Sequence, residues 1–238
     1  MEKRITRRRL HTLSGAAALG FFLVAHLLTQ ATAIGGQGAW MAFAGAVERS
    51  RVWPLFELLF IVVPFAFHVG YGVVLWRGPV DEREVARYGS RVRWKVQRLT
   101  GILVLAFVLG HLWETRIQKL AFGLEPAAVH TVLVAHLSWT WAGIPFVALL
   151  YLLGLGVTCA HFANGLMAAS LALGIGEGEA GRRKMQAGSL ITGSLLFVLG
   201  ALTVIALATG TRLHAWRGDD SAPCGDRVPA VPTPPTFR

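Results

Sequence analysis

The chain of 238 residues has little charge. Only 15% of its residues are Asp, Glu, Lys or Arg, whereas 54% are hydrophobic, and the mean hydropathy is +0.52. A soluble domain usually carries about 25% charged residues. The charge present here is too little to cover a water-facing surface, which excludes a soluble enzyme, a coiled coil and a disordered chain.

Cysteine is scarce as well. The two cysteines, Cys159 and Cys224, exclude a disulfide framework and a cysteine-based zinc site. The sequence also has no cysteine cluster for iron–sulfur binding and no flavin fingerprint. We interpret Cys159 as a small packing residue and Cys224 as free or bridged to another chain.

Acidic residues are outnumbered by basic ones, 13 against 23, which gives a net charge of +10. In a soluble protein this excess would indicate a nucleic-acid partner. Here the basic residues fall between long apolar runs. The pattern therefore predicts a membrane protein whose basic residues lie beside lipid, and no nucleic-acid partner.

Five apolar segments are long enough to cross a hydrocarbon layer of about 30 Å, which takes about 20 helical residues. They predict an all-α, polytopic membrane helix bundle, residues 10–211, with spans at about 10–34, 53–76, 94–115, 145–175 and 187–211. The segment at 127–141 is expected to be an interfacial or half-inserted helix. The Pro-rich tail, 212–238, has no hydrophobic periodicity and is predicted to be disordered.

Lys and Arg are distributed unevenly between the two ends of these spans. Most of them lie in the N-terminal segment 1–9, in the loop between the second and third spans, and at 182–184. The positive-inside rule therefore predicts a cytoplasmic N-terminus and a C-terminal tail outside. A cleavable signal, with Ala31-Thr32-Ala33 before the cut or with twin arginines at Arg7-Arg8-Arg9, is the alternative. We favour a retained span because the apolar segment is long and contains a histidine.

Each of the first four spans contains one histidine: His26, His68, His111 and His161. An ionisable side chain at membrane depth is costly and usually marks a functional site. A single histidine could simply hydrogen-bond to a neighbouring helix, but four on four helices, with almost no carboxylates as partners, point to ligation. Neutral imidazole is a common axial ligand of haem iron.

Depth in the membrane predicts how these histidines pair. The first and third spans run outward, and His26 lies 17 residues past Arg9, or about 25 Å along a helix. We therefore expect His26 and His111 to hold an outer haem, and His68 and His161 an inner one. The other histidines are less informative. His11 and His214 are interpreted as solvated, and His130 and His136 as candidates for contact with a quinone or a haem.

Small residues near two of these histidines suit a flat macrocycle that approaches the backbone. They lie within two helical turns of His68 or His161, at Gly72, Gly154 and Gly165. Ordinary helix packing in membranes is the alternative explanation.

Four sequence blocks around the histidines resemble the dihaem cytochrome b membrane subunit of succinate:quinone oxidoreductases, the succinate dehydrogenases and fumarate reductases. The resemblance covers about residues 9–176. The blocks are Arg9-Leu10-His11-Thr12 running to His26-Leu27, Pro64-Phe65-Ala66-Phe67-His68 with Gly70 and Gly72, Gln97-Arg98-Leu99-Thr100-Gly101 running to His111 and Thr115-Arg116-Ile117, and His161-Phe162-Ala163-Asn164-Gly165-Leu166.

The resemblance implies two haems b, held by the first span with the third and by the second with the fourth. It also implies a multi-pass protein of the bacterial inner membrane, a flavoprotein and an iron–sulfur subunit on the cytoplasmic face, and a membrane quinone, menaquinone or ubiquinone, as substrate. The succinate site would lie outside this chain. Positions similar to the family's contacts with the inner-haem propionates are occupied by Trp94, Arg98, His11 and Thr12.

The only acids inside the predicted spans are Glu57 and Glu114, both toward the outside. Quinone reduction takes up two protons, so we expect these acids to serve quinone protonation near the outer haem. The alternative is that each is an interfacial acid, paired with Arg116 or Arg51. Two other functions stay open: a dihaem cytochrome b of a formate dehydrogenase, hydrogenase or heterodisulfide-type reductase, and a haem-free transporter or scaffold.

Overall fold

The computed structural model describes residues 2–80, 82–176 and 178–210. In these ranges the chain forms helices and no strands. The five helical segments in them that are long and apolar enough to cross a membrane confirm the predicted all-α polytopic bundle. They are Arg7–Gly35, Trp53–Arg77, Arg91–Phe122, Phe146–Ala172 and Gly178–Thr209.

The first three spans each contain a π-helical segment, a feature often found at functional sites. The first span consists of α1 (Glu2–Leu13), the π segment η1 (Ser14–Leu19), α2 (Gly20–Ala31) and the 3-10 turn η2 (Thr32–Gly35). The second consists of α4 (Trp53–Glu57), the π segment η3 (Leu58–Val62) and α5 (Val63–Arg77). The third consists of α7 (Arg91–Leu112), the π segment η4 (Trp113–Ile117) and α8 (Gln118–Phe122). The fourth and fifth spans are the single helices α10 (Phe146–Ala172) and α11 (Gly178–Thr209).

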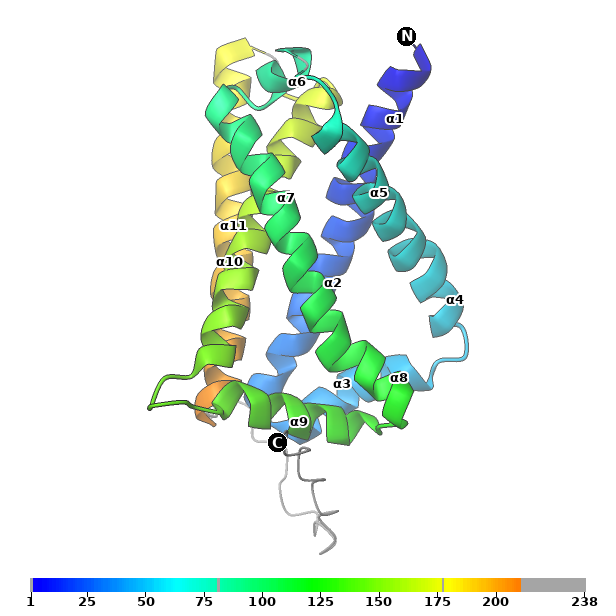
Figure 1. The fold of residues 1–238 in the computed structure, drawn as a ribbon, viewed down its shortest axis with the longest axis vertical. Helices are drawn as coiled ribbons and strands as arrows, with labels where there is room; N and C mark the ends of the chain where they lie inside the picture. Colours follow the sequence, from blue (N-terminus) through cyan, green and yellow to red (C-terminus); the bar gives the residue numbers. More distant parts are fainter. Residues whose placement is uncertain (1, 81, 177, 211–238) are drawn as a thin grey trace, which may run out of the picture.

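Three shorter helices lie at the ends of the bundle. Two of them, α3 (Gln37–Arg49) and α9 (Pro126–Ser138), lie across one end, whereas α6 (Glu82–Arg87) lies at the end where the chain begins (Figure 1). The 13 residues of α9 make it about 20 Å long, too short to cross about 30 Å of hydrocarbon. The structure therefore has a short helix across the end of the bundle where the sequence predicts an interfacial or half-inserted one.

The buried core lies in two places. One cluster joins α3 and α9 to the ends of the first, fourth and fifth spans and includes Trp40 and Leu137, which is only 1% exposed. The other lies in the middle of the bundle around Leu155 and Cys159. There α10 and α11 are in close contact. A Cβ atom at Gly193 would lie only 3.1 Å from the carbonyl oxygen of Cys159. Small residues at such contacts are typical of membrane helices.

Large hydrophobic side chains are exposed along the spans, among them Phe60 (56%) and Leu195 (65%). Such a surface suits lipid rather than water. The N-terminus and the end of α11 lie at opposite ends of the bundle (Figure 1), as an odd number of spans requires. The predicted disordered tail, with Cys224 and His214, lies outside the described residues.

Candidate haem and quinone sites

The four intramembrane histidines form two pairs. His26 on α2 and His111 on α7 have ring centroids 5.8 Å apart and nearly perpendicular planes. His68 on α5 and His161 on α10 have centroids 6.4 Å apart, also nearly perpendicular. The structure thus brings together the same partners that depth in the membrane predicts.

Hydrogen bonding fixes the tautomer of His68. Its Nδ1 lies 3.0 Å from the backbone carbonyl oxygen of His11, and the His11 ring stacks on the His68 ring at 4.2 Å. The hydroxyl of Ser14 donates to the same carbonyl. A carbonyl only accepts, so Nδ1 of His68 carries the proton and Nε2 keeps its lone pair.

The same tautomer follows for His161. Its Nδ1 lies 3.1 Å from Oγ1 of Thr100, whose hydroxyl proton is donated to the carbonyl of Val96 at 2.8 Å. That hydroxyl therefore accepts from Nδ1. On the other side of the ring, Nε2 lies 3.3 Å from the amide nitrogen of Gln97. The amide oxygen of Gln97 accepts from Asn164 at 2.9 Å, so Nε2 of His161 is again an acceptor.

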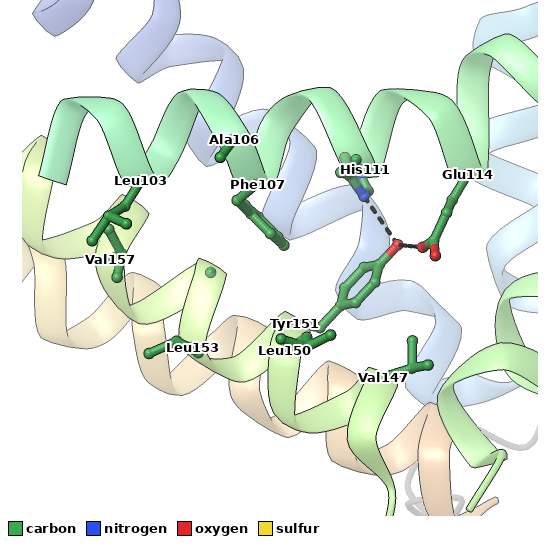
Figure 2. A pocket seen from close by; sticks show the side chains of 12 residues that line it. Leu103, Ala106, Phe107, His111, Glu114, Val147, Leu150, Tyr151, Leu153 and Val157 are labelled. Carbon is green, nitrogen blue, oxygen red and sulfur yellow. Dashed lines mark hydrogen bonds between the residues drawn. The ribbon is translucent and has the colours of Figure 1, made fainter.

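His111 follows this pattern through a tyrosine. Its Nδ1 lies 3.3 Å from Oη of Tyr151, and Tyr151 donates its hydroxyl proton to Glu114 at 2.7 Å (Figure 2). The tyrosine oxygen therefore accepts from Nδ1. Sequence reasoning missed Tyr151. Its signal was a phenolic hydroxyl inside a predicted span, because a buried tyrosine hydroxyl usually has a partner.

Three of the four histidines therefore hold their proton on Nδ1 and a lone pair on Nε2, the arrangement that metal-ligating imidazoles adopt. Among the described residues, no group of three or more His, Cys, Asp or Glu side chains could hold a metal ion. A pair of imidazoles can nevertheless hold a haem, because the macrocycle supplies the other ligands of the iron.

Glycines allow two of the histidine rings to approach a helix backbone. A Cβ atom at Gly15, in η1, would lie 2.4 Å from Cε1 of His68, and one at Gly101 would lie 3.2 Å from Cε1 of His161. The glycines singled out from the sequence meet other side chains instead: Gly72 meets His11, Gly154 meets Phe107, and Gly165 meets Gln97.

Two nitrogens near the inner pair are buried and have no hydrogen-bond partner among the described residues: Nδ1 of His11 and Nε1 of Trp94. Leaving a buried polar group unpaired costs about 1–3 kcal/mol, so such groups point to a ligand. The interpretation of His11 as solvated is therefore wrong, because its ring packs against His68 inside the bundle. Both residues are among the four expected to contact the inner-haem propionates, and this part of the bundle fits a ligand that carries carboxylates.

The other two residues of that set are differently engaged. The Arg98 guanidinium lies over the ring of Trp94, 4.6 Å from its centroid, and donates to the backbone carbonyl of Trp76. The hydroxyl of Thr12 donates to the carbonyl of Arg8 at 3.1 Å. Arg98 is thus held beside one of the two unpaired nitrogens, whereas the hydroxyl proton of Thr12 is already used.

A pocket of about 340 Å³ lies between α7 and α10 beside His111 (Figure 2). Its polar groups are His111, Glu114 and Tyr151. Two of its lining residues, Leu150 and Leu153, are 62% and 65% exposed, so the pocket opens toward the lipid-facing surface. An apolar pocket with a few convergent polar groups is typical of a small-molecule site. Apolar or glycine residues make up the rest of its lining, at Leu103, Ala106, Phe107, Gly110, Val147, Leu150, Leu153, Gly154 and Val157.

The two intramembrane acids differ in their surroundings. Glu57 accepts from Arg116 at 2.5 Å, which links the second and third spans. This ion pair is the one that the sequence offered as the alternative for Glu57. Glu114 faces the pocket and accepts from Tyr151.

Of the two remaining candidate histidines, His130 is the more informative. It lies on α9 against the ring of Trp40, with centroids 5.5 Å apart, and burial lowers its pKa. Its Nε2 is buried without a hydrogen-bond partner among the described residues. His136 lies on the same helix.

This chain is similar to the succinate dehydrogenase cytochrome b558 subunit of Bacillus subtilis (strain 168). The two are 32% identical over 170 residues, which cover 71% of this chain and 79% of that protein. No family model matches the chain, and no solved structure matches it. Identity at this level over most of both chains, together with five membrane-type helices, shows that this multi-pass membrane protein belongs to the family of succinate dehydrogenase cytochrome b subunits.

Proposed function

We propose that the chain is the membrane anchor and electron-transfer subunit of a succinate:quinone oxidoreductase and that it binds two haems b. The observation that carries this proposal is the shared tautomer of His68, His111 and His161, each with Nδ1 anchored and a lone pair on Nε2. His26 with His111 would hold the outer haem, and His68 with His161 the inner one. When bound, haem b supplies one-electron redox chemistry.

The chain's own residues orient the two inner imidazoles and would supply hydrogen bonds to the inner haem. The backbone carbonyl of His11 and the Thr100 hydroxyl hold the two imidazoles in orientation. The unpaired nitrogens of His11 and Trp94, with the Arg98 guanidinium beside Trp94, would hold carboxylates by charge-assisted hydrogen bonds. Thr12 would join them only by turning its hydroxyl away from the carbonyl of Arg8.

The end of the bundle that bears the N-terminus and α6 is proposed to face the cytoplasm of a bacterium, with the chain in its inner membrane. Most Lys and Arg residues lie on this side, as the positive-inside rule requires. A flavoprotein and an iron–sulfur subunit would dock here. Oxidation of succinate in those partners releases two electrons and two protons, and reduction of the quinone consumes two of each.

The pocket between α7 and α10 is proposed to bind the quinone head group. It adjoins His111, its walls are apolar, and it opens toward lipid, where a quinone dissolves. Glu114 would supply protons, and the Tyr151 hydroxyl lies within reach of the same space. The ion pair of Glu57 with Arg116 makes Glu57 less available, so Glu114 is the better placed of the two predicted acids.

Purification of the whole complex tests the proposed function. We expect b-type bands in the reduced-minus-oxidised absorbance spectrum, two haems per copy of this chain, and co-purified flavoprotein and iron–sulfur subunits. Absence of b-type bands after expression with adequate haem would contradict the proposal, and one haem per chain would contradict the pairing. The proposed orientation is tested with spheroplasts. Protease added to them should leave a tag on the cytoplasmic N-terminus uncut.

Filling the pocket should slow quinone reduction selectively. A Cβ atom at Gly110 would meet nothing within 4 Å, and Gly110 lines the pocket, so Gly110→Leu adds apolar bulk without a collision. We expect the kcat/KM for a soluble quinone to fall by about tenfold or more, with both haems retained. Gly188→Leu, on α11 and equally open, is the matched control. Unchanged kinetics in Gly110→Leu would exclude this pocket.

A further inference from the structure

The hydrogen-bonded partners of the anchored histidines differ in charge. His68 donates to a backbone carbonyl. His161 donates to Thr100, whose own proton goes to a backbone carbonyl. His111 instead donates to Tyr151, whose proton goes to the carboxylate of Glu114. Among the residues that the structure describes, only the outer pair has a hydrogen-bonded connection that ends in an acid.

We propose that Tyr151 and Glu114 are positioning residues that set the reduction potential of the outer haem through the Nδ1 proton of His111. This inference rests on the proposed haem binding. It concerns the hydrogen-bonded partners of His111 rather than His111 itself. It also gives Tyr151 a role that is separate from any contact with quinone.

The physical basis is polarisation along a chain of hydrogen bonds. A carboxylate that accepts from the tyrosine hydroxyl makes the hydroxyl oxygen a stronger acceptor for the Nδ1 proton of His111, because neighbouring hydrogen bonds reinforce each other in a low-dielectric interior. A partly withdrawn Nδ1 proton raises the electron density at Nε2 and the basicity of the imidazole as a ligand. A more basic ligand stabilises the oxidised iron and lowers the reduction potential.

Neighbouring side chains hold this series of hydrogen bonds in place. The ring of Tyr151 packs edge-on against Phe107 and His111, each with centroids 5.7 Å away, which fixes the position of its hydroxyl. Arg116, two residues beyond Glu114, is already engaged by Glu57 at 2.5 Å.

The test is an optical redox titration of the purified complex, in which the midpoint potential of each haem is measured separately. Tyr151→Phe removes the hydroxyl and keeps the ring, so the outer haem should become easier to reduce. We expect its reduction equilibrium constant to rise about tenfold, which corresponds to about 59 mV for a one-electron couple. The inner haem should not shift.

Glu114→Gln keeps an acceptor for the tyrosine hydroxyl and removes the charge, so it should raise the same potential. If Glu114 acts through Tyr151, the double variant should shift no further than Tyr151→Phe alone. Tyr71→Phe, whose ring lies 6.0 Å from that of His11 beside the inner pair, is the control and should leave the outer potential unchanged.

Three results would overturn the proposal: an unshifted outer potential in Tyr151→Phe, additive shifts in the double variant, or an equal shift in Tyr71→Phe. If Tyr151→Phe fails to retain the outer haem, the potential of Glu114→Gln decides, and no shift in that variant overturns the inference. Failure of the underlying function is distinct, because the unaltered protein would then lack two b-type haems altogether.

Discussion

The His111→Ala variant is expected to lose one of the two proposed haems and to keep the other. His111 and His26 face each other with ring centroids 5.8 Å apart, so the substitution removes one of the two imidazoles of the proposed outer site. The inner pair lies on α5 and α10, and its anchoring groups come from other residues. The loss should therefore be confined to the outer haem.

Haem content per chain and low-temperature reduced-minus-oxidised spectra measure this outcome, because each haem contributes its own band. The mirror experiment, His161→Ala, should remove the other band and leave the first. His136→Ala, on α9 at one end of the bundle (Figure 1), is the comparison variant. It should keep both bands, which would also exclude His136 as a haem ligand. Two haems retained in His111→Ala would contradict the assignment, as would the same band lost in both ligand variants.

Substitution of Gly15 by valine should remove the inner haem without touching any ligand. A Cβ atom at this position would lie 2.4 Å from Cε1 of His68 and 2.8 Å from its Nδ1. The ring would have to rotate or move away, which breaks its hydrogen bond to the carbonyl of His11. Overpacking of this kind costs about 1–3 kcal/mol, and a displaced imidazole no longer reaches the iron.

Gly70→Val is the matched control for that experiment. Gly70 lies two residues from His68 on α5, and a Cβ atom there would meet nothing within 4 Å. It therefore tests the effect of a β-branched residue in a membrane helix without a collision. We expect Gly70→Val to keep both haems and Gly15→Val to keep only the outer one. A full complement of haem in Gly15→Val would show that His68 tolerates displacement.

The sequence was sufficient for the number of spans and for the pairing of the histidines. Both depend on one-dimensional quantities: the length of an apolar run, and the distance of a residue from the nearest charged end. The helices extend beyond the predicted spans. The fifth helix begins at Gly178, whereas the predicted span begins near residue 187, because a helix can continue through polar residues such as Arg182 and Lys184 outside the hydrocarbon.

The residues that contact the four histidines could not be predicted in the same way. Gln97 and Asn164 lie within the quoted motifs but had no predicted role, and Tyr151 and Gly15 were not predicted as site residues. Their contacts depend on how each helix is rotated about its own axis and on its height against its neighbours. A single sequence leaves these undetermined, because most of the apolar positions around such helices are nearly equivalent.

The fifth span contains no histidine, yet its contact with α10 affects both histidine pairs. His161 and Tyr151 lie ten residues apart on α10, or about 15 Å along its axis, and they serve different histidine pairs. The glycine-lined face of α11 packs tightly against α10, at Gly193 against Ala163 and at Gly200 against Leu155. Any rotation of α10 would misalign both histidine pairs at once, so the packing of α11 against α10 keeps the two pairs in register.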